Sequence, residues 1–218
     1  MPPANVEPIG IAILTKAPEP GKVKTRLAMM LGVEGAARLH ERFVTRTVEA
    51  AAAAATGPIT IWASPDASHP FFQDLGQRFP LTYQRQAGDD LGERMYVAIA
   101  YAKAPVIVIG TDCPLLTADH LRDAAEVLRG GSDAVIFPAQ DGGYVLIGLR
   151  RPIPELFARL AWSSDGVMME TRQRLRHLGL SWREPVHDLW DVDRPTDVMR
   201  MRREGLTELL DGIDTRAK

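Results

Sequence analysis

Four basic side chains crowd a short proline- and glycine-rich stretch, KAPEPGKVKTRL, near the start of the chain: Lys16, Lys22, Lys24 and Arg26. Cations held this close together repel one another, and an anion between them would relieve that repulsion through charge-assisted hydrogen bonds. A turn at Gly21 that feeds a helix would add free N–H groups and a favourable helix dipole. The stretch therefore predicts a polyphosphate site, with a solvated basic loop as the alternative.

The basic stretch differs from the phosphate-binding P-loop, G-x-x-x-x-G-K-[ST]. Lys16 stands where the first glycine belongs, and Val23 stands where the hydroxyl residue belongs. A triphosphate would therefore be held chiefly by the basic side chains.

Three aspartates are candidates for a metal site. Asp112 directly follows the apolar run VIVIG, where an unpaired carboxylate would be costly. A Mg²⁺ or Mn²⁺ ligand is the preferred role, because Thr117 can cap the next helix. Asp191 and Asp193 would point the same way on an extended segment. One of them could cap the helix that Pro195 starts, and the other could be a second metal ligand.

Two glycine-containing loops have open alternatives. The run at 141–144, DGGY, either lets backbone approach a ligand closely or forms a simple turn. The loop with Gly92 and Arg94 precedes a helix, and it either contacts a nucleotide base or caps that helix through Asp89 or Asp90.

Two other kinds of chemistry are less favoured. Cys113 is expected to be a small buried thiol rather than a nucleophile, because no histidine in the sequence stands out as its base. A metal-dependent hydrolase would have to use His187, Asp188, Asp191 and Asp193. It is disfavoured because no second histidine lies nearby at ligand spacing.

Short apolar runs alternate with helical patterns along the chain. Strands are expected at 10–15, 59–64, 81–86, 106–110, 133–139 and 144–149, with a weaker one at 181–189, and helices at 34–55, 90–103, 117–129 and 164–178. The alternation predicts a three-layer, Rossmann-like α/β fold with a mostly parallel sheet, made mixed by a hairpin across QDGG. Ligands collect at the carboxyl ends of such strands, where the charged loops lie. We expect a single domain over 1–218, with a core at about 9–203.

The overall composition excludes some partners. The 218 residues are 45% hydrophobic and 25% charged, and the net charge is −2, so no general basic field favours nucleic acid or membrane. A single cysteine allows no internal disulfide. No apolar run approaches the ~20 residues that cross a bilayer, and the polar start MPPANVEP lacks a signal-peptide core. A cytoplasmic protein is expected.

Six motifs in order span about residues 10 to 197: KAPEPGKVKTRL, LGERM, IGTDCP, DGGYVLIGL, WSSDGV and DVDRPTD. Together they resemble the glycosyltransferase-like family related to 2-phospho-lactate guanylyltransferase. That family belongs to the nucleotide-diphospho-sugar transferase superfamily, which has the GT-A fold. The resemblance implies a nucleoside triphosphate or nucleotide sugar bound over the strand ends, together with Mg²⁺ or Mn²⁺.

The resemblance also implies roles for particular residues. The family's phosphate-holding loop maps to Lys16, Gly21, Lys24 and Arg26, and its base or ribose region to Leu91, Gly92 and Arg94. The metal residue maps to Asp112, with Asp191 and Asp193 as the candidates that would complete the metal site. The acceptor side maps to Asp141, Gly142, Gly143, Tyr144, Trp162, Ser163 and Ser164. The residues expected to act in catalysis are Lys16, Lys24, Arg26 and Asp112.

The leading hypothesis is metal-dependent nucleotidyl transfer from a nucleoside triphosphate to a small phosphorylated or hydroxylated acceptor. Glycosyl transfer from a nucleotide sugar ranks second, because four basic residues exceed what a diphosphate needs. The central strand also ends in TDC rather than in a D-x-D motif, with Gly110 in place of the first aspartate. A non-catalytic nucleotide-binding protein is the third alternative. The base, the acceptor and the oligomeric state are left open.

Overall fold

The computed structural model describes residues 6–103, 105–162, 164–186 and 189–213. Seven strands form one sheet in the order β3-β2-β1-β4-β6-β5-β7. The strands are β1 (Gly10–Lys16), β2 (Ile59–Ser64), β3 (Leu81–Arg85), β4 (Val106–Ile109), β5 (Ala134–Pro138), β6 (Tyr144–Leu149) and β7 (Trp182–Arg183). Only β6 runs antiparallel to its neighbours, β4 and β5. The sheet is therefore mixed and mostly parallel, as predicted.

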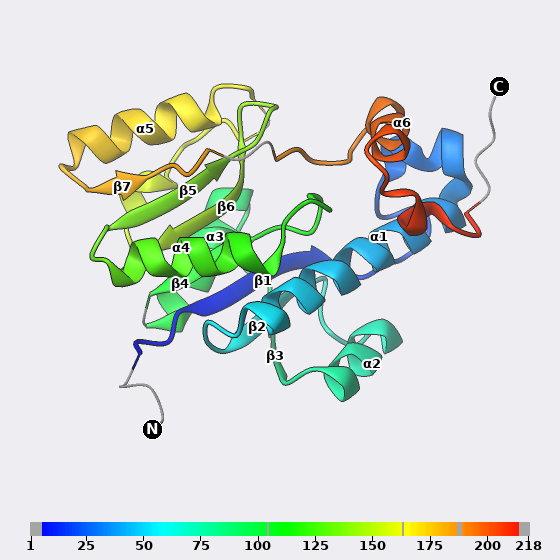
Figure 1. Ribbon diagram of the computed structural model, residues 1–218, viewed down its shortest axis with the longest axis horizontal. Coiled ribbons are helices and arrows are strands. Elements are labelled where there is room, and N and C mark those ends of the chain that lie inside the picture. Colours follow the sequence, from blue (N-terminus) through cyan, green and yellow to red (C-terminus); the bar gives the residue numbers. More distant parts are fainter. Residues whose placement is uncertain (1–5, 104, 163, 187–188, 214–218) are drawn as a thin grey trace.

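Helices cover both faces of this sheet (Figure 1). One face carries α1 (Ala28–Ala54), α2 (Pro70–Arg78) and α4 (Ala118–Arg129), and the other carries α3 (Leu91–Ala102) and α5 (Val167–His177). Because strand side chains alternate between faces, Ile11 and Ile13 pack under the first group while Ala12 packs under the second. The predicted three-layer α/β fold is confirmed.

Most expected elements appear close to their predicted bounds. The hairpin between β5 and β6 forms across residues 139–143, and Thr117 caps α4 by accepting from His120 N–H. The weak strand expected at 181–189 shrinks to Trp182–Arg183. Helix α2 was not expected, although Pro70 in its first turn is a recognised start signal. None of the helices in the described residues is both long and apolar enough to cross a bilayer.

The basic stretch does not run straight into a long helix. It leads into a short 3₁₀ turn, Thr25–Leu27, and α1 is then broken at Gly32, where φ is 70°. The expected phosphate site at a helix N-terminus is thus replaced by a loop whose side chains, rather than a helix dipole, supply the positive charge.

A separate apolar cluster holds the C-terminal segment against the start of α1. Leu27 and Phe43 pack there with Trp190 and Val192, beside helix α6 (Pro195–Arg203). Figure 1 shows α6 next to the first turns of α1. Since Trp190 and Val192 are anchored on this side, the aspartates that alternate with them are brought to the end of the sheet.

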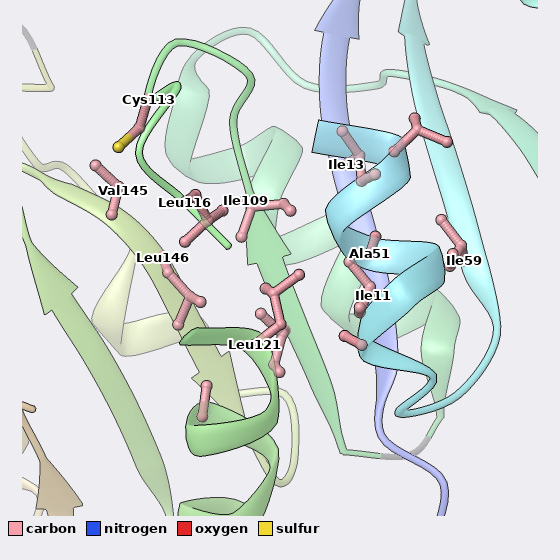
Figure 2. Packing of buried hydrophobic residues seen from close by; sticks show 14 of the residues in the cluster. Ile11, Ile13, Ala51, Ile59, Ile109, Cys113, Leu116, Leu121, Val145 and Leu146 are labelled. Atoms are coloured by element: carbon pink, nitrogen blue, oxygen red, sulfur yellow. The ribbon is translucent and has the colours of Figure 1, made fainter. Parts of the chain in front are cut away.

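The cluster under α1 and α4 reaches the end of β4. Figure 2 shows Cys113 beside Val145, with Leu116 near them and Ile109 on the strand below. Burial raises the pKa of the Cys113 thiol to about 12. This thiol is therefore protonated at neutral pH, which agrees with the expectation of a buried structural cysteine.

Candidate active site

A cavity of about 930 Å³ opens where β1 and β4 end. Its walls include six segments far apart in the sequence: the basic loop, the start of α3, the turn after β4, the β5–β6 hairpin, the described residues of 162–167 and the stretch before α6. The predicted site residues that line it are Lys16, Lys22, Lys24, Arg26, Leu91, Arg94, Asp112, Asp141, Gly143, Tyr144, Trp162, Ser164, Asp191 and Asp193. The size is that of a typical small-molecule site.

Lys24 is the centre of this cavity's polar network. Its ammonium Nζ lies 2.6 Å from Oδ1 of Asp112 and 2.9 Å from Oδ1 of Asp193, and it donates to the carbonyl of Val192 at 2.7 Å. Only 4% of the lysine side chain is exposed. Burial by itself lowers the pKa of Lys24, but the two carboxylates outweigh it and hold the pKa above its usual value. The side chain is therefore a permanent cation.

Backbone geometry sends Lys24 inward. Its φ of 45° is left-handed, which is unusual for a lysine and turns the chain just before the 3₁₀ turn. The ammonium then passes 5.6 Å from the ring centre of Phe43 on α1. Val192 N–H donates to the carbonyl of Asp112 at 2.9 Å, so the two aspartate segments are also joined directly.

Asp191 is the most strongly perturbed acid in the cavity. Burial, followed by repulsion from the Asp112 and Asp193 carboxylates, raises its pKa to about 8. Lys24 opposes this shift, and Asp141 adds to it. Three carboxyl groups thus lie near one ammonium. A further cation at this cluster would be stabilised by the carboxylates.

Asp191→Asn should remove a pH-dependent loss of stability in metal-free protein. The native state keeps the Asp191 proton up to about pH 8, whereas the unfolded chain releases it near pH 4. The native state thus binds more protons between these values, so the free energy of unfolding falls as pH rises. Urea unfolding in EDTA should show wild type and variant equal near pH 4, with the variant more stable by roughly 2–4 kcal/mol at pH 8.

Asp119→Asn is the matched control, because Asp119 is an exposed acid on α4 that pairs with Arg122. A stability difference between Asp191→Asn and wild type that stayed constant from pH 4 to pH 8 would contradict the raised pKa.

The other cations of the basic loop remain accessible. Lys16, Lys22 and Arg26 are exposed and line the cavity, and Lys22 is paired only with Glu19, at 2.5 Å, among the described ion pairs. The loop therefore presents three accessible cations around one buried cation.

Several lining residues were not predicted. His40 on α1 contacts the carbonyl of Lys16 through Nε2 at 3.1 Å, and Gln86 donates to the carbonyls of Thr15 and Trp62 at 2.9 Å and 2.8 Å. Burial lowers the pKa of His40, so its ring is neutral and Nε2–H is the donor. These side chains hold the ends of β1 and β2. No local sequence pattern marks them, because their partners lie far away in the chain.

The glycines at 92 and 142 serve protein packing. A methyl group on Gly92 would overlap the indole of Trp162, and one on Gly142 would overlap the backbone carbonyl of Asp165. Gly21, Gly92 and Gly142 are not among the residues that line the cavity, so their predicted direct contact with ligand finds no support there. The loops that contain Gly92 and Gly142 instead pack against the segment that carries Trp162 and Asp165.

Gly142→Ala should destabilise the protein more than a left-handed glycine change alone. Gly142 has a φ of 88°, which costs an alanine about 1–2 kcal/mol, and the overlap with Asp165 adds about 1–3 kcal/mol. Gly131→Ala is the control, because its φ is 96° and nothing lies within 4 Å of its added methyl. Thermal unfolding of both variants would decide, and equal losses would contradict the predicted overlap.

Three predictions about caps and placement have mixed outcomes. Asp90 caps α3 by accepting from Glu93 N–H at 2.8 Å. Neither Asp191 nor Asp193 caps α6, since the carboxylate of Asp197 accepts from the N–H groups there. Ser163, His187 and Asp188 lie outside the described residues.

The carboxylate cluster fits a divalent cation only in part. Among the described residues, no three acidic, histidine or cysteine side chains are grouped so as to hold a metal ion by themselves. Mg²⁺, however, is commonly held by one or two carboxylates together with substrate phosphates. Asp112 and Asp193 remain 43% and 46% exposed beside the cavity, and their charge exceeds that of Lys24. The donor set therefore suits an ion whose coordination a phosphate completes.

The three-layer fold with its mixed, mostly parallel sheet matches the fold of a solved structure from the class of the nucleotide-diphospho-sugar transferases. A candidate nucleotide-diphospho-sugar transferase from Desulfovibrio desulfuricans G20 shares 29% identity, with a TM-score of 0.77 over 92% of this chain and 97% of that one. The chain belongs to the DUF2064 family, described as uncharacterized proteins conserved in bacteria, whose pattern matches residues 47–164.

More distant structures share the fold. A nucleotidyl transferase from Methanothermobacter thermautotroptrophicus has a TM-score of 0.60 at 15% identity, covering 92% of this chain and 99% of that one. A 4-diphosphocytidyl-2C-methyl-D-erythritol synthase from Anaerococcus prevotii DSM 20548 has a TM-score of 0.58 at 10% identity, covering 91% and 96%. Among curated proteins, none matches this sequence.

Proposed function

We propose that this protein is a metal-dependent nucleotidyltransferase that uses a nucleoside triphosphate. The observation that carries the proposal is the contact of the Lys24 ammonium with Asp112 and Asp193. That contact joins the basic loop to the strand-end carboxylates inside one cavity. The comparisons support the coarser part of the proposal, a transferase that uses nucleotides.

The chain's own residues would act mainly by positioning and by neutralising charge. Lys16 and Arg26 would hold the β- and γ-phosphates and stabilise charge on the departing pyrophosphate, while the buried Lys24 would add positive charge and position Asp112 and Asp193. Asp112, with Asp193 or Asp191, would hold Mg²⁺ or Mn²⁺. When bound, the ion would neutralise the phosphate oxygens. Arg94 and Leu91, at the start of α3, would face the nucleoside.

Glycosyl transfer is the second candidate function. The relative from Desulfovibrio desulfuricans G20, at 29% identity, favours a nucleotide-sugar donor. The basic loop favours a triphosphate, because its accessible cations Lys16, Lys22 and Arg26 surround Lys24 and together exceed the charge of a diphosphate.

A ligand comparison separates the candidates. Melting temperatures would be measured with triphosphates, diphosphates and nucleotide sugars at equal concentration, with Mg²⁺ or with EDTA. At equal concentration the ligand that binds more tightly raises the melting temperature more. We expect the largest shift with a triphosphate plus Mg²⁺, and transfer of α-phosphate label to an acceptor with release of pyrophosphate.

Two results would count against nucleotidyl transfer. A larger shift with nucleotide sugars would favour the glycosyl alternative. Tight triphosphate binding that EDTA does not weaken, together with no transfer of label, would favour a non-catalytic nucleotide-binding protein.

A further inference from the structure

Charge is divided unevenly around the cavity. The basic loop supplies Lys16, Lys22 and Arg26 on one side. A second part of the lining, made by residues 141, 143–145, 162, 164, 165 and 167, carries the carboxylates of Asp141 and Asp165 and no basic side chain. The basic loop is therefore suited to phosphate, and this second part is suited to hydrogen-bond donors.

The acidic wall, defined as the lining residues 141, 143–145, 162, 164, 165 and 167, is also aromatic. Tyr144 and Trp162 line it with ring centres 6.3 Å apart at 89°, and Phe157 stacks behind Trp162. The Tyr144 hydroxyl and the Trp162 indole N–H are buried, so the rings rather than these polar atoms would meet a ligand. The ring faces suit C–H groups, and the exposed carboxylates of Asp141 and Asp165 can accept from O–H groups of the same molecule.

We propose that the acceptor is a neutral, hydroxyl-rich molecule of the sugar or polyol class, bound against the acidic wall. This inference rests on the proposed nucleotidyl transfer and narrows its acceptor. An acceptor hydroxyl oxygen bonds to the α-phosphorus, and the bond from that phosphorus to the bridging oxygen breaks. Pyrophosphate leaves with the electron pair, and the hydroxyl proton passes to a carboxylate of the wall and then to water.

A phosphorylated acceptor fits this wall poorly. Its dianionic group would face Asp141 and Asp165 with no basic side chain on that wall, and like charges at short range repel. Neutral hydroxyl groups, in contrast, can donate to those carboxylates, which are exposed and able to accept.

Matched acceptor pairs test the inference directly. Transfer of label from an α-labelled triphosphate would be measured with glycerol, erythritol and glucose, each beside its own monophosphate ester. For any pair whose members accept label, we expect kcat/KM to be at least about tenfold higher with the unphosphorylated compound than with its phosphate ester. This ratio corresponds to a preference of roughly 1.4 kcal/mol. Preference for the phosphate ester, or transfer to neither member of any pair while triphosphate still binds, would overturn the inference.

Two variants tie the preference to the wall. Asp141→Asn keeps the oxygen that accepts from Gly143 N–H at 2.9 Å, and Asp165→Asn changes an exposed side chain, so neither should disturb the fold. Both together should shift the ratio of the two kcat/KM values toward the phosphate ester by about tenfold, since two like charges are removed. Asp119→Asn, outside the cavity, should leave the ratio unchanged. A ratio that both wall changes leave unaltered would also overturn the inference.

The proposed function and this inference fail differently. Absence of triphosphate binding in a folded protein would refute nucleotidyl transfer itself. Normal triphosphate binding and label transfer, but with phosphate esters preferred, would refute only the acceptor class.

Discussion

Replacing Lys24 with methionine should lower kcat by about 10²–10³-fold, the size of loss that follows removal of one preorganised charge from a reaction site. The methionine keeps most of the length of the side chain and removes its charge. Asp112 and Asp193 would then face each other with no cation between them, so the variant should also lose about 1–3 kcal/mol of stability. Measurements of kcat, triphosphate affinity and urea unfolding on one preparation would separate the two effects.

The loss of positive charge in Lys24→Met should also change metal binding. Because the ammonium lies between Asp112 and Asp193, its loss should tighten Mg²⁺ binding in the absence of nucleotide, as measured by calorimetry. Arg78→Met, which breaks a surface pair with Glu49 and a cation–π contact with Phe79 far from the cavity lining, is the control for loss of a basic residue. Lys22→Met should give a smaller loss than Lys24→Met, since Lys22 is exposed. Wild-type turnover in Lys24→Met would refute the proposed role of the basic loop.

Asp112→Asn should lower kcat by a similar 10²–10³-fold and raise the Mg²⁺ concentration needed for half-maximal rate at least about tenfold. The amide is nearly isosteric, and Lys24 keeps its contact with Asp193, so the free energy of unfolding should change by less than about 1 kcal/mol. Activity is therefore expected to fall without loss of the fold. Rate measurements over a Mg²⁺ titration would show whether the missing carboxylate acts on the metal.

The Asp112 prediction has its own control. Asp119→Asn removes an acid from the surface of α4 and should leave both kcat and the Mg²⁺ requirement unchanged. If Asp112→Asn had a lower kcat but an unchanged Mg²⁺ requirement, Asp112 would act by orienting Lys24 rather than by holding the ion.

Local sequence was a good guide to the architecture. The continuous apolar runs of β1 and β4 predict buried parallel strands, and the short QDGG link predicts the one antiparallel hairpin. Because those strands are parallel, their carboxyl ends lie at one edge of the sheet, so the basic loop after β1 and Asp112 after β4 are predicted to be close together. The contact between Lys24 and Asp112 agrees with this prediction.

Other features depend on contacts that no local pattern carries. His40 and Gln86 line the cavity because α1 and β3 pass beside the end of β1, and their spacing in the sequence has no meaning for a ligand. The glycines at 92 and 142 look like ligand-binding glycines. Only the packed structure shows that Trp162 and Asp165 occupy the space beside them.

The sequence alone sufficed for the α/β class, the mixed sheet, the family resemblance and the gathering of charged loops at one edge, because strand periodicity and turn residues act over short distances. Tertiary structure alone decided which of the four cations turns inward, that Asp191 is the acid of the three with the strongly raised pKa, and that the acidic wall lines the same cavity as the basic loop. Those outcomes depend on burial and on distances between residues more than 160 positions apart, as in the bond from Lys24 to Val192, and such distances exist only after folding.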